Sequence, residues 1–243
     1  MKQVAFLLLA ASVAACGASS SGGATGDGHL RTLTVFAASS LSSVFAAEGK
    51  AFEAAHAGVR VTFSFAGSQA LVAQVKQGAP ADVLATADTS SMAAAGLTGP
   101  RVFARNRLSI ITAPQNPRHV TTLADLARPG LRVVLAGPTV PVGKAALKAL
   151  TAAGVTAHPV SLEQDVKGVV TKVRLGEADA GIAYVTDVSA AKGTIDGTAL
   201  PGVSNSYPVA VVKQGADAQA FCDFLISASG QSVLASFGFL PPS

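Results

Sequence analysis

The sequence predicts an α/β fold with a largely parallel sheet. Two observations carry this prediction: strand-like and helix-like segments alternate along most of the chain, and several strand-like segments end in serine or glycine where a helix begins. In open α/β sheets, ligands bind beyond the carboxyl ends of the strands, where such turns lie. Residues 31–243 are long enough for one large domain or two small ones.

The first part of the chain contains short apolar segments that read as buried strands. We expect these strands at residues 33–36, 59–65, 82–85 and 108–112. Helices are expected to begin near Ser40 and at Ser68, each directly after a strand. This order is typical of repeated strand–helix units.

The second part of the chain continues the alternation. An apolar strand at 131–135 leads to a helix from Val142, and strands follow at 178–184 and 209–212. A helix from Val166 has apolar residues in the i, i+3, i+4, i+7 pattern, and a last helix begins at Ala216.

The N-terminus has the features of an export signal. Lys2 precedes an apolar stretch at 4–15, which is too short to span a membrane as a mature helix. The stretch ends in VAAC at 13–16, which resembles the lipobox of bacterial lipoproteins. We therefore expect a signal peptide at 1–15, a lipid on Cys16, a flexible tether at 16–30 and a location on the extracytoplasmic side of the cell membrane. The alternative is an ordinary cleaved signal peptide in which Cys16 has no special role.

The charge of the chain argues against nucleic acid as a partner, and its cysteine content argues against a reactive thiol. The formal net charge is +4, and removal of Lys2 with the signal peptide lowers it to +3. Without a dense cluster of Lys and Arg, nucleic acid is not an expected partner. Cys222 lies in a helical apolar pattern, so we expect a small core residue rather than a reactive thiol.

No catalytic motif is complete. The segment 137–145 resembles a P-loop but has five residues between its glycines and lacks the Ser or Thr that would hold magnesium. The histidines lack zinc-ligand spacing, and His56 suits the end of a helix. A serine hydrolase would need a base beside Ser40 or Ser68, and the sequence shows none. We therefore expect a binding protein and not an enzyme, with no cofactor.

Four segments read as helix beginnings that could face one ligand. They lie at 36–41, 65–68, 140–143 and 164–167. A helix start presents unpaired backbone N–H groups and the positive end of the helix dipole, so it attracts anions. Together these segments predict a pocket that surrounds an anion with hydrogen-bond donors.

From Leu33 onward the chain resembles the periplasmic molybdate-binding protein of bacterial ABC transporters. The resemblance rests on an ordered set of segments: FAASSL at 36–41, FAGS at 65–68, GAPADV at 78–83, VPVG at 140–143, DVKG at 165–168, GIAY at 181–184 and YPVAVV at 207–212. It implies a two-lobed type II periplasmic binding protein fold, with mixed sheets, helices on both faces and the ligand in the interlobe cleft. Lobe I would comprise 31–108 and 209–243, and lobe II 109–208.

The same resemblance implies the function and the site. The protein would bind molybdate, and tungstate too, and deliver it to a membrane permease driven by a separate ATPase; we expect a monomer. The ligand positions carried over are Ser40, Ser68, Val142, Val166 and Tyr184, with molybdenum present only as the oxyanion. The two valines would contribute backbone N–H groups alone.

Each of these residues also has a simpler interpretation. Ser40 and Ser68 could be helix N-caps, the valine side chains could be core, and Tyr184 could be half-buried with its tip in water. Ser39 is a weaker candidate than Ser40, because the family often has alanine there.

The donor set favours a fully deprotonated dianion, which has only acceptors. Phosphate keeps a proton near neutral pH and would need an acceptor, and no carboxylate occupies a matched position, although Asp165 and Asp187 lie close in sequence. Sulfate differs from molybdate only in size, so a binding protein for sulfate or another tetrahedral oxyanion is the alternative.

Overall fold

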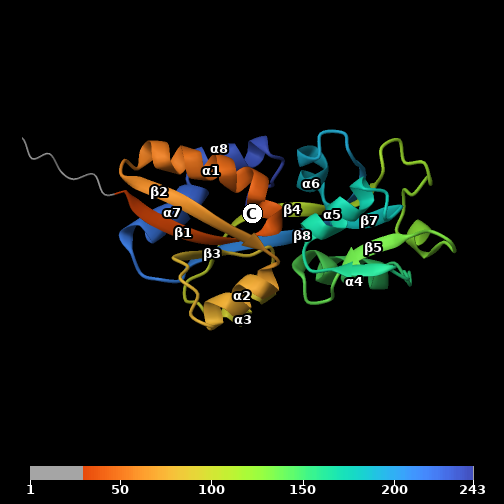
Figure 1. The fold of residues 1–243 in the computed structure, drawn as a ribbon, viewed down its shortest axis with the longest axis horizontal. Coiled ribbons are helices and arrows are strands. Elements are labelled where there is room, and N and C mark those ends of the chain that lie inside the picture. The colour runs from red at the N-terminus through yellow and green to blue at the C-terminus, as the bar shows by residue number, and fades with distance from the viewer. Residues whose placement is uncertain (1–29, 243) are drawn as a thin grey trace, which may run out of the picture.

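A computed structural model of the chain describes residues 30–242. The predicted signal peptide, Cys16 and nearly all of the predicted tether lie outside these residues. Eight strands form one sheet in the order β2-β1-β3-β8-β4-β7-β5-β6 (Figure 1). The strands are β1 (Arg31–Ala38), β2 (Val59–Ala66), β3 (Val83–Ala85), β4 (Arg101–Thr112), β5 (Val133–Ala136), β6 (Ser161–Glu163), β7 (Ala180–Tyr184) and β8 (Asp196–Val211).

Helices lie on both sides of this sheet, as predicted. They are α1 (Ser42–Ala55), α2 (Ser68–Lys76), α3 (Thr89–Ala95), α4 (Pro141–Ala152), α5 (Val166–Arg174), α6 (Val185–Ala190), α7 (Ala216–Ile226) and α8 (Ala228–Ser236), with short 3-10 turns η1 (Ser39–Leu41) and η2 (Ala124–Ala127). In Figure 1, α1 and α8 cover one face of the sheet around β1, and α2 and α3 cover the other.

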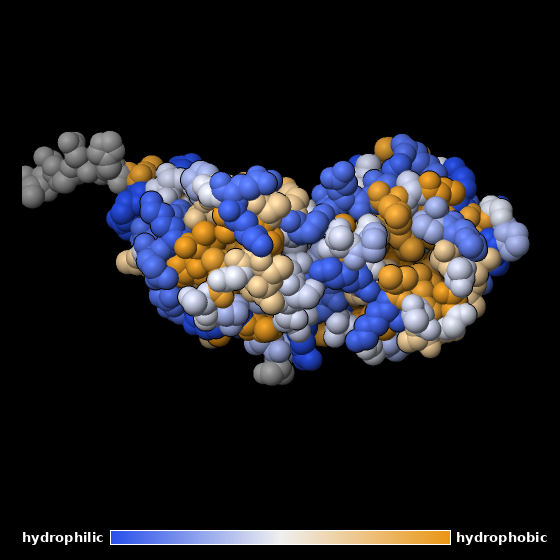
Figure 2. All heavy atoms as spheres, turned by 90° about the horizontal axis from the view of Figure 1, so that it is seen from below, coloured by the Kyte–Doolittle hydropathy of each residue, from blue (hydrophilic) through white to orange (hydrophobic). Residues whose placement is uncertain are grey.

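The sheet joins two halves of the molecule. The first half contains β1, β2 and β3, the second contains β5, β6 and β7, and β4 and β8 run through both (Figure 1). Figure 2 shows a waist between the two halves. The lobe boundaries expected at 108/109 and 208/209 fall inside the two strands that connect the halves.

The sheet is mixed rather than largely parallel. Pairing is parallel within each half, between β1 and its neighbours and between β5 and its neighbours. The three pairings made by β4 and β8 are antiparallel. The alternation in the sequence therefore predicts the arrangement within each half, whereas the antiparallel centre corrects it for the whole and confirms the mixed sheet that the family resemblance implied.

The two connecting strands are much longer than the sequence predicted. We expected strands at 108–112 and 209–212, and the structure has Arg101–Thr112 and Asp196–Val211. Polar residues interrupt the apolar pattern in both, but the strands pair with each other over most of their length, and Asn106 lies opposite Asn205. Cross-strand pairing here outweighs local strand propensity.

Aromatic side chains fill the core of the first half. Phe45, Phe52 and Phe221 are fully buried, and Phe221 meets both others edge to face. Cys222 is buried beside them, and burial raises the pKa of its thiol to about 11, as expected for a core residue. His56 ends α1, as predicted, with Nδ1 within 3.0 Å of the Phe52 carbonyl oxygen.

Residues 30–242 offer neither a membrane-spanning helix nor a cluster of metal ligands. Every helix there is too short or too polar to cross a membrane. The same residues contain no group of three or more His, Cys, Asp or Glu side chains placed to hold a metal ion.

Candidate anion-binding site

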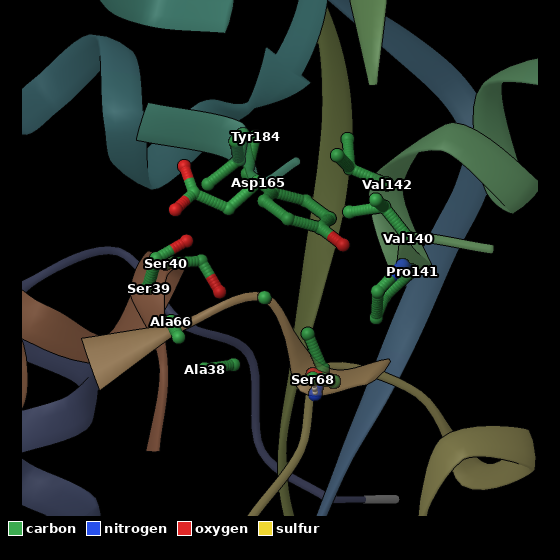
Figure 3. Close-up of a pocket in the computed structure, with 13 residues that line it drawn as sticks. Ala38, Ser39, Ser40, Ala66, Ser68, Val140, Pro141, Val142, Asp165 and Tyr184 are labelled. Carbon is green, nitrogen blue, oxygen red and sulfur yellow. Dashed lines mark hydrogen bonds between the residues drawn. The ribbon is translucent and has the colours of Figure 1, made fainter. Parts of the chain in front are cut away.

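A small cavity lies at the junction of the two halves, where several helices begin. It has room for about one water molecule, which is far too little for an extended metabolite. Figure 3 shows Ser40 and Ser68 on the side of the first half, with Val142 and the ring of Tyr184 opposite. The lining residues are Ala38, Ser39, Ser40, Ala66, Gly67, Ser68, Ala87, Val140, Pro141, Val142, Asp165, Val166 and Tyr184.

The first half contributes two buried serines. Ser40 lies in η1 directly after β1, and Ser68 is the first residue of α2, after β2. Neither side chain caps its helix, so the N-cap interpretation was wrong. Each hydroxyl oxygen instead accepts a hydrogen bond from behind the cavity: the Tyr207 hydroxyl donates to Ser40 Oγ at 3.1 Å, and the Ala87 N–H donates to Ser68 Oγ at 3.0 Å.

Gly67 allows the two halves to approach closely beside the cavity. A Cβ at this position would lie 2.4 Å from the backbone oxygen of Gln164, which belongs to the second half. The Gln69 side-chain amide donates to that same oxygen at 2.8 Å. A side chain at residue 67 would therefore force the halves apart.

The second half contributes the first turns of α4 and α5. Pro141 occupies the first position of α4 and has no N–H, so Val142 supplies the first backbone donor of that helix. In α5, the Asp165 carboxylate caps the helix by accepting from the Gly168 N–H at 3.0 Å. The N–H groups of Val142 and Val166 have no acceptor within their helices. Both valine side chains are buried in the core, as expected.

Tyr184 ends β7 and precedes α6. Its side chain is only 1% exposed, so the interpretation as a half-buried residue with its tip in water was wrong. The Asn205 amide donates to its hydroxyl oxygen at 2.8 Å. Burial raises the pKa of Tyr184 well above its usual value, so the hydroxyl keeps its proton and remains a donor.

A partly buried ion pair supports the backbone of Tyr184. The Tyr184 N–H donates to Asp187 Oδ2 at 3.2 Å, and Lys167 Nζ donates to Asp187 Oδ1 at 2.8 Å. Burial raises the pKa of Asp187, although Lys167 acts in the opposite direction. Asp187 therefore has its own partners and is not a lining residue of the cavity.

The electrostatic field of the cavity comes from helix starts rather than from formal charges. Within residues 30–242, the only charged side chain that lines it is that of Asp165, one of whose oxygens caps α5. Backbone N–H groups at helix starts attract an anion without a formal counter-charge.

The structure brings together all five residues expected from the sequence to bind the ligand. Ser40, Ser68, Val142, Val166 and Tyr184 line the same cavity, and Ser39 lines it as well. Sequence reasoning missed Asn205 and Tyr207, whose side chains stand behind these hydroxyls. No local signal in the segment around them predicts that role, because their partners lie far away in the chain.

Contacts outside the cavity also join the halves. Lys144 in α4 donates to the carboxylate of Asp88 at 3.0 Å and to Ser90 Oγ at 2.9 Å. Asp88 caps α3 by accepting from the Ser91 N–H. Together with the Gln69 contact, this ion pair holds the halves together on the rim of the cavity.

Comparison with known proteins gives consistent matches. The family model for bacterial extracellular solute-binding proteins matches residues 33–240. The molybdate-binding protein ModA of Mycobacterium tuberculosis is 42% identical over 250 residues, covering 97% of this chain and 95% of that protein.

Solved structures share the fold. The periplasmic molybdate-binding protein of Azotobacter vinelandii has a TM-score of 0.71 at 19% identity, covering 87% of this chain and 100% of that chain. The sulfate-binding protein SubI of Mycobacterium tuberculosis has a TM-score of 0.77 at 21% identity, covering 87% of each chain. These relatives are binding proteins, which confirms the expectation that the chain is not an enzyme.

Proposed function

Because this chain belongs to the bacterial extracellular solute-binding proteins, in the family of the molybdate-binding protein ModA, we propose that it binds molybdate and delivers it to an ABC transporter. One observation carries the proposal. Six separate segments of the chain converge on one small cavity that offers hydroxyl and backbone N–H donors and no Lys or Arg among the described residues.

The ligand-binding residues that we propose are Ser40, Ser68, Val142, Val166 and Tyr184. The three side chains donate through hydroxyls, and the two valines donate through backbone N–H groups, together with those of the serines. Molybdate is a tetrahedral dianion whose oxygens only accept, so these hydroxyl and N–H donors fit it, while the Asp165 carboxylate that also lines the cavity caps α5 with one oxygen. Several such bonds to a charged ligand are strong enough together to replace a counter-charge.

Size and protonation would set the selectivity. Hydrogen phosphate presents a proton for which the cavity has no free acceptor besides Asp165. Sulfate has the charge of molybdate but is smaller, so it reaches fewer donors at once. Tungstate has the same charge and nearly the same size as molybdate, and we expect it to bind about as well.

Delivery requires membrane partners. We propose that the exported protein loses residues 1–15, carries lipid on Cys16 and is held on the extracytoplasmic face of the membrane by the tether at 16–30. There it would act as a monomer, with lobes at 31–108 plus 209–243 and at 109–208, and pass molybdate to a permease driven by a separate ATPase.

Titration calorimetry of the protein from residue 30 onward tests the substrate. Molybdate and tungstate should bind with similar affinity, sulfate much more weakly and phosphate hardly at all. Tighter binding of sulfate or phosphate than of molybdate would overturn the choice of substrate and favour the sulfate-binding alternative.

A further inference from the structure

Four hydroxyl side chains line the cavity, and three of them, those of Ser40, Ser68 and Tyr184, accept a hydrogen bond from a fixed donor behind them. The Ala87 N–H donates to Ser68, the Tyr207 hydroxyl to Ser40, and the Asn205 amide to Tyr184. A hydroxyl carries one proton and two acceptor lone pairs. Once it accepts from behind, its own proton is free to point into the cavity.

The direction of the Asn205 bond is determined by its other partners. The same amide nitrogen lies 3.1 Å from the Ala87 carbonyl oxygen and 3.4 Å from the Pro141 carbonyl oxygen. Carbonyl oxygens only accept, so the group that faces them is the NH₂ and not the amide oxygen. Asn205 therefore donates to Tyr184 and cannot accept from it.

Asn205 contacts one of these hydroxyls directly and holds the backbone residue that donates to a second. It donates to the carbonyl of Ala87, and the N–H of that same residue donates to Ser68. Tyr207 acts on the third, and its fully buried hydroxyl gives its proton to Ser40. Asn205 and Tyr207 lie two residues apart on β8, one of the strands that connect the halves.

We infer that Asn205 and Tyr207 are positioning residues that direct the protons of Ser40, Ser68 and Tyr184 into the cavity, so that these hydroxyls meet the ligand as donors and disfavour oxyanions that still carry a proton. A protonated oxyanion needs an acceptor, and a serine or tyrosine oxygen would supply one if nothing donated to it from behind. The inference rests on the proposed function, because it assumes that an oxyanion occupies the cavity. It assigns selectivity to residues that do not line the cavity.

The test compares molybdate with arsenate in mildly alkaline buffer. Under that condition both ions carry two negative charges, but only hydrogen arsenate carries a proton. The ratio of their affinities therefore isolates the effect of the proton from effects of charge or of closure, which act on both ions alike. Calorimetry on wild type, Asn205→Asp, Tyr207→Phe and Ser109→Ala supplies the ratios.

Asn205→Asp keeps the shape of the side chain but replaces the donor with an acceptor. We expect the preference for molybdate over arsenate to fall by about tenfold, the effect of one hydrogen bond to a charged ligand. Tyr207→Phe keeps the ring and should lower the preference by about three- to tenfold. Ser109→Ala removes a buried hydroxyl that bonds the Ile110 carbonyl away from the cavity, and it should leave the ratio unchanged.

Two other results would overturn the inference, and they are distinguishable. If both variants weaken molybdate and arsenate by the same factor, the residues are structural or electrostatic only, and the proposed function stands. If wild type does not bind molybdate, the proposed function fails before any variant is measured. Should Asn205→Asp not fold by circular dichroism, the ratio for Tyr207→Phe decides.

Discussion

The two halves of the molecule supply the same kind of donor to the cavity by different means. In the first half, Ser40 and Ser68 present side-chain hydroxyls at the ends of two parallel strands. In the second half, Val142 and Val166 present backbone N–H groups, and their side chains serve the core. If the proposed residues hold the ligand, binding in the first half depends on residue identity, and in the second half largely on backbone geometry.

The halves differ also in how they bury a carboxylate. Asp187 in the second half has Lys167 and the Tyr184 N–H as partners. Glu48 on α1 in the first half is fully buried, and neither of its oxygens has a hydrogen-bond partner. Burial raises the pKa of Glu48 to about 8. The core of the first half therefore contains a carboxyl group without a hydrogen-bond partner or a counter-charge among residues 30–242.

The largest expected effect follows from Glu48. Because its pKa is raised on folding, the folded state holds a proton that the unfolded chain releases, so the contribution of Glu48 to stability is greatest below its ordinary pKa and is lost as the pH rises toward about 8. The free energy of unfolding should drop by up to about 4 kcal/mol between roughly pH 5 and pH 8. Urea unfolding of wild type and Glu48→Gln measures this, and the variant should lose that slope.

The exposed Glu177 provides the matched control for this test. Glu177→Gln should keep the wild-type slope. An equal slope in wild type and in Glu48→Gln would contradict the assignment to Glu48.

The next prediction concerns the side-chain donors of the first half. Ser40→Ala and Ser68→Ala should each weaken molybdate binding by about 1.5–3 kcal/mol, the value of a hydrogen bond to a charged group. Binding should persist, because backbone donors remain. Calorimetry of both variants checks this, with Ser109→Ala as the control, and unchanged affinity in both would remove these serines from the site.

A proline tests the backbone donor of the second half. Val166 is the first residue of α5, where proline is tolerated, and Asp165 before it is extended, as the residue before a proline must be. Val166→Pro should weaken molybdate binding by about 1–3 kcal/mol, because it removes one N–H. Val166→Ala keeps the N–H and should bind as wild type does, although both variants lose core packing. Equal affinities of the two variants would refute the backbone donor.

Tyr184 is the exception in the second half, since it donates through a side chain. Tyr184→Phe keeps the ring and should weaken molybdate and tungstate binding equally, by about 1–3 kcal/mol. Sulfate should lose less, because it is too small to reach every donor at once. A larger loss for sulfate than for molybdate, measured by the same titrations, would show that size does not set the selectivity.

The smallest expected effect concerns the contact between the halves. Lys144 and Asp88 form a partly exposed ion pair, so Lys144→Met should weaken molybdate binding by only about 0.2–1 kcal/mol. The matched control is Arg132→Met, which breaks an ion pair with Asp179 inside the second half. The control should bind molybdate as wild type does. An equal loss of affinity in both variants would mean that the contact between the halves does not contribute to molybdate binding.

The contrast between side-chain donors and backbone donors also explains which parts of the site the sequence could predict. Serines after apolar strands are visible as motifs, and so is the valine periodicity of α5. The backbone role of Val142 came only from the family resemblance, since valine itself signals core. Asn205 and Tyr207 were missed because their function depends on Tyr184 and Ser40, which β8 meets only in the folded chain.

The long connecting strands were missed for a related reason. Gly202 and Pro201 lie within β8, and charged residues such as Arg105 lie within β4. Local propensity disfavours strands at such positions, and only the pairing of the two strands with each other overcomes it. Features that arise from contacts distant in sequence therefore escaped prediction, whereas local strand–helix turns did not.

A crystal structure of the protein with molybdate tests the central claim most directly, since molybdenum can be located by its anomalous scattering. We expect one molybdenum peak in the cavity, with oxyanion oxygens at about 2.7–3.1 Å from the hydroxyls of Ser40, Ser68 and Tyr184 and from the backbone nitrogens of Val142 and Val166. A peak outside this cavity, or an ion held by Lys or Arg side chains, would contradict a site built from neutral donors of both halves.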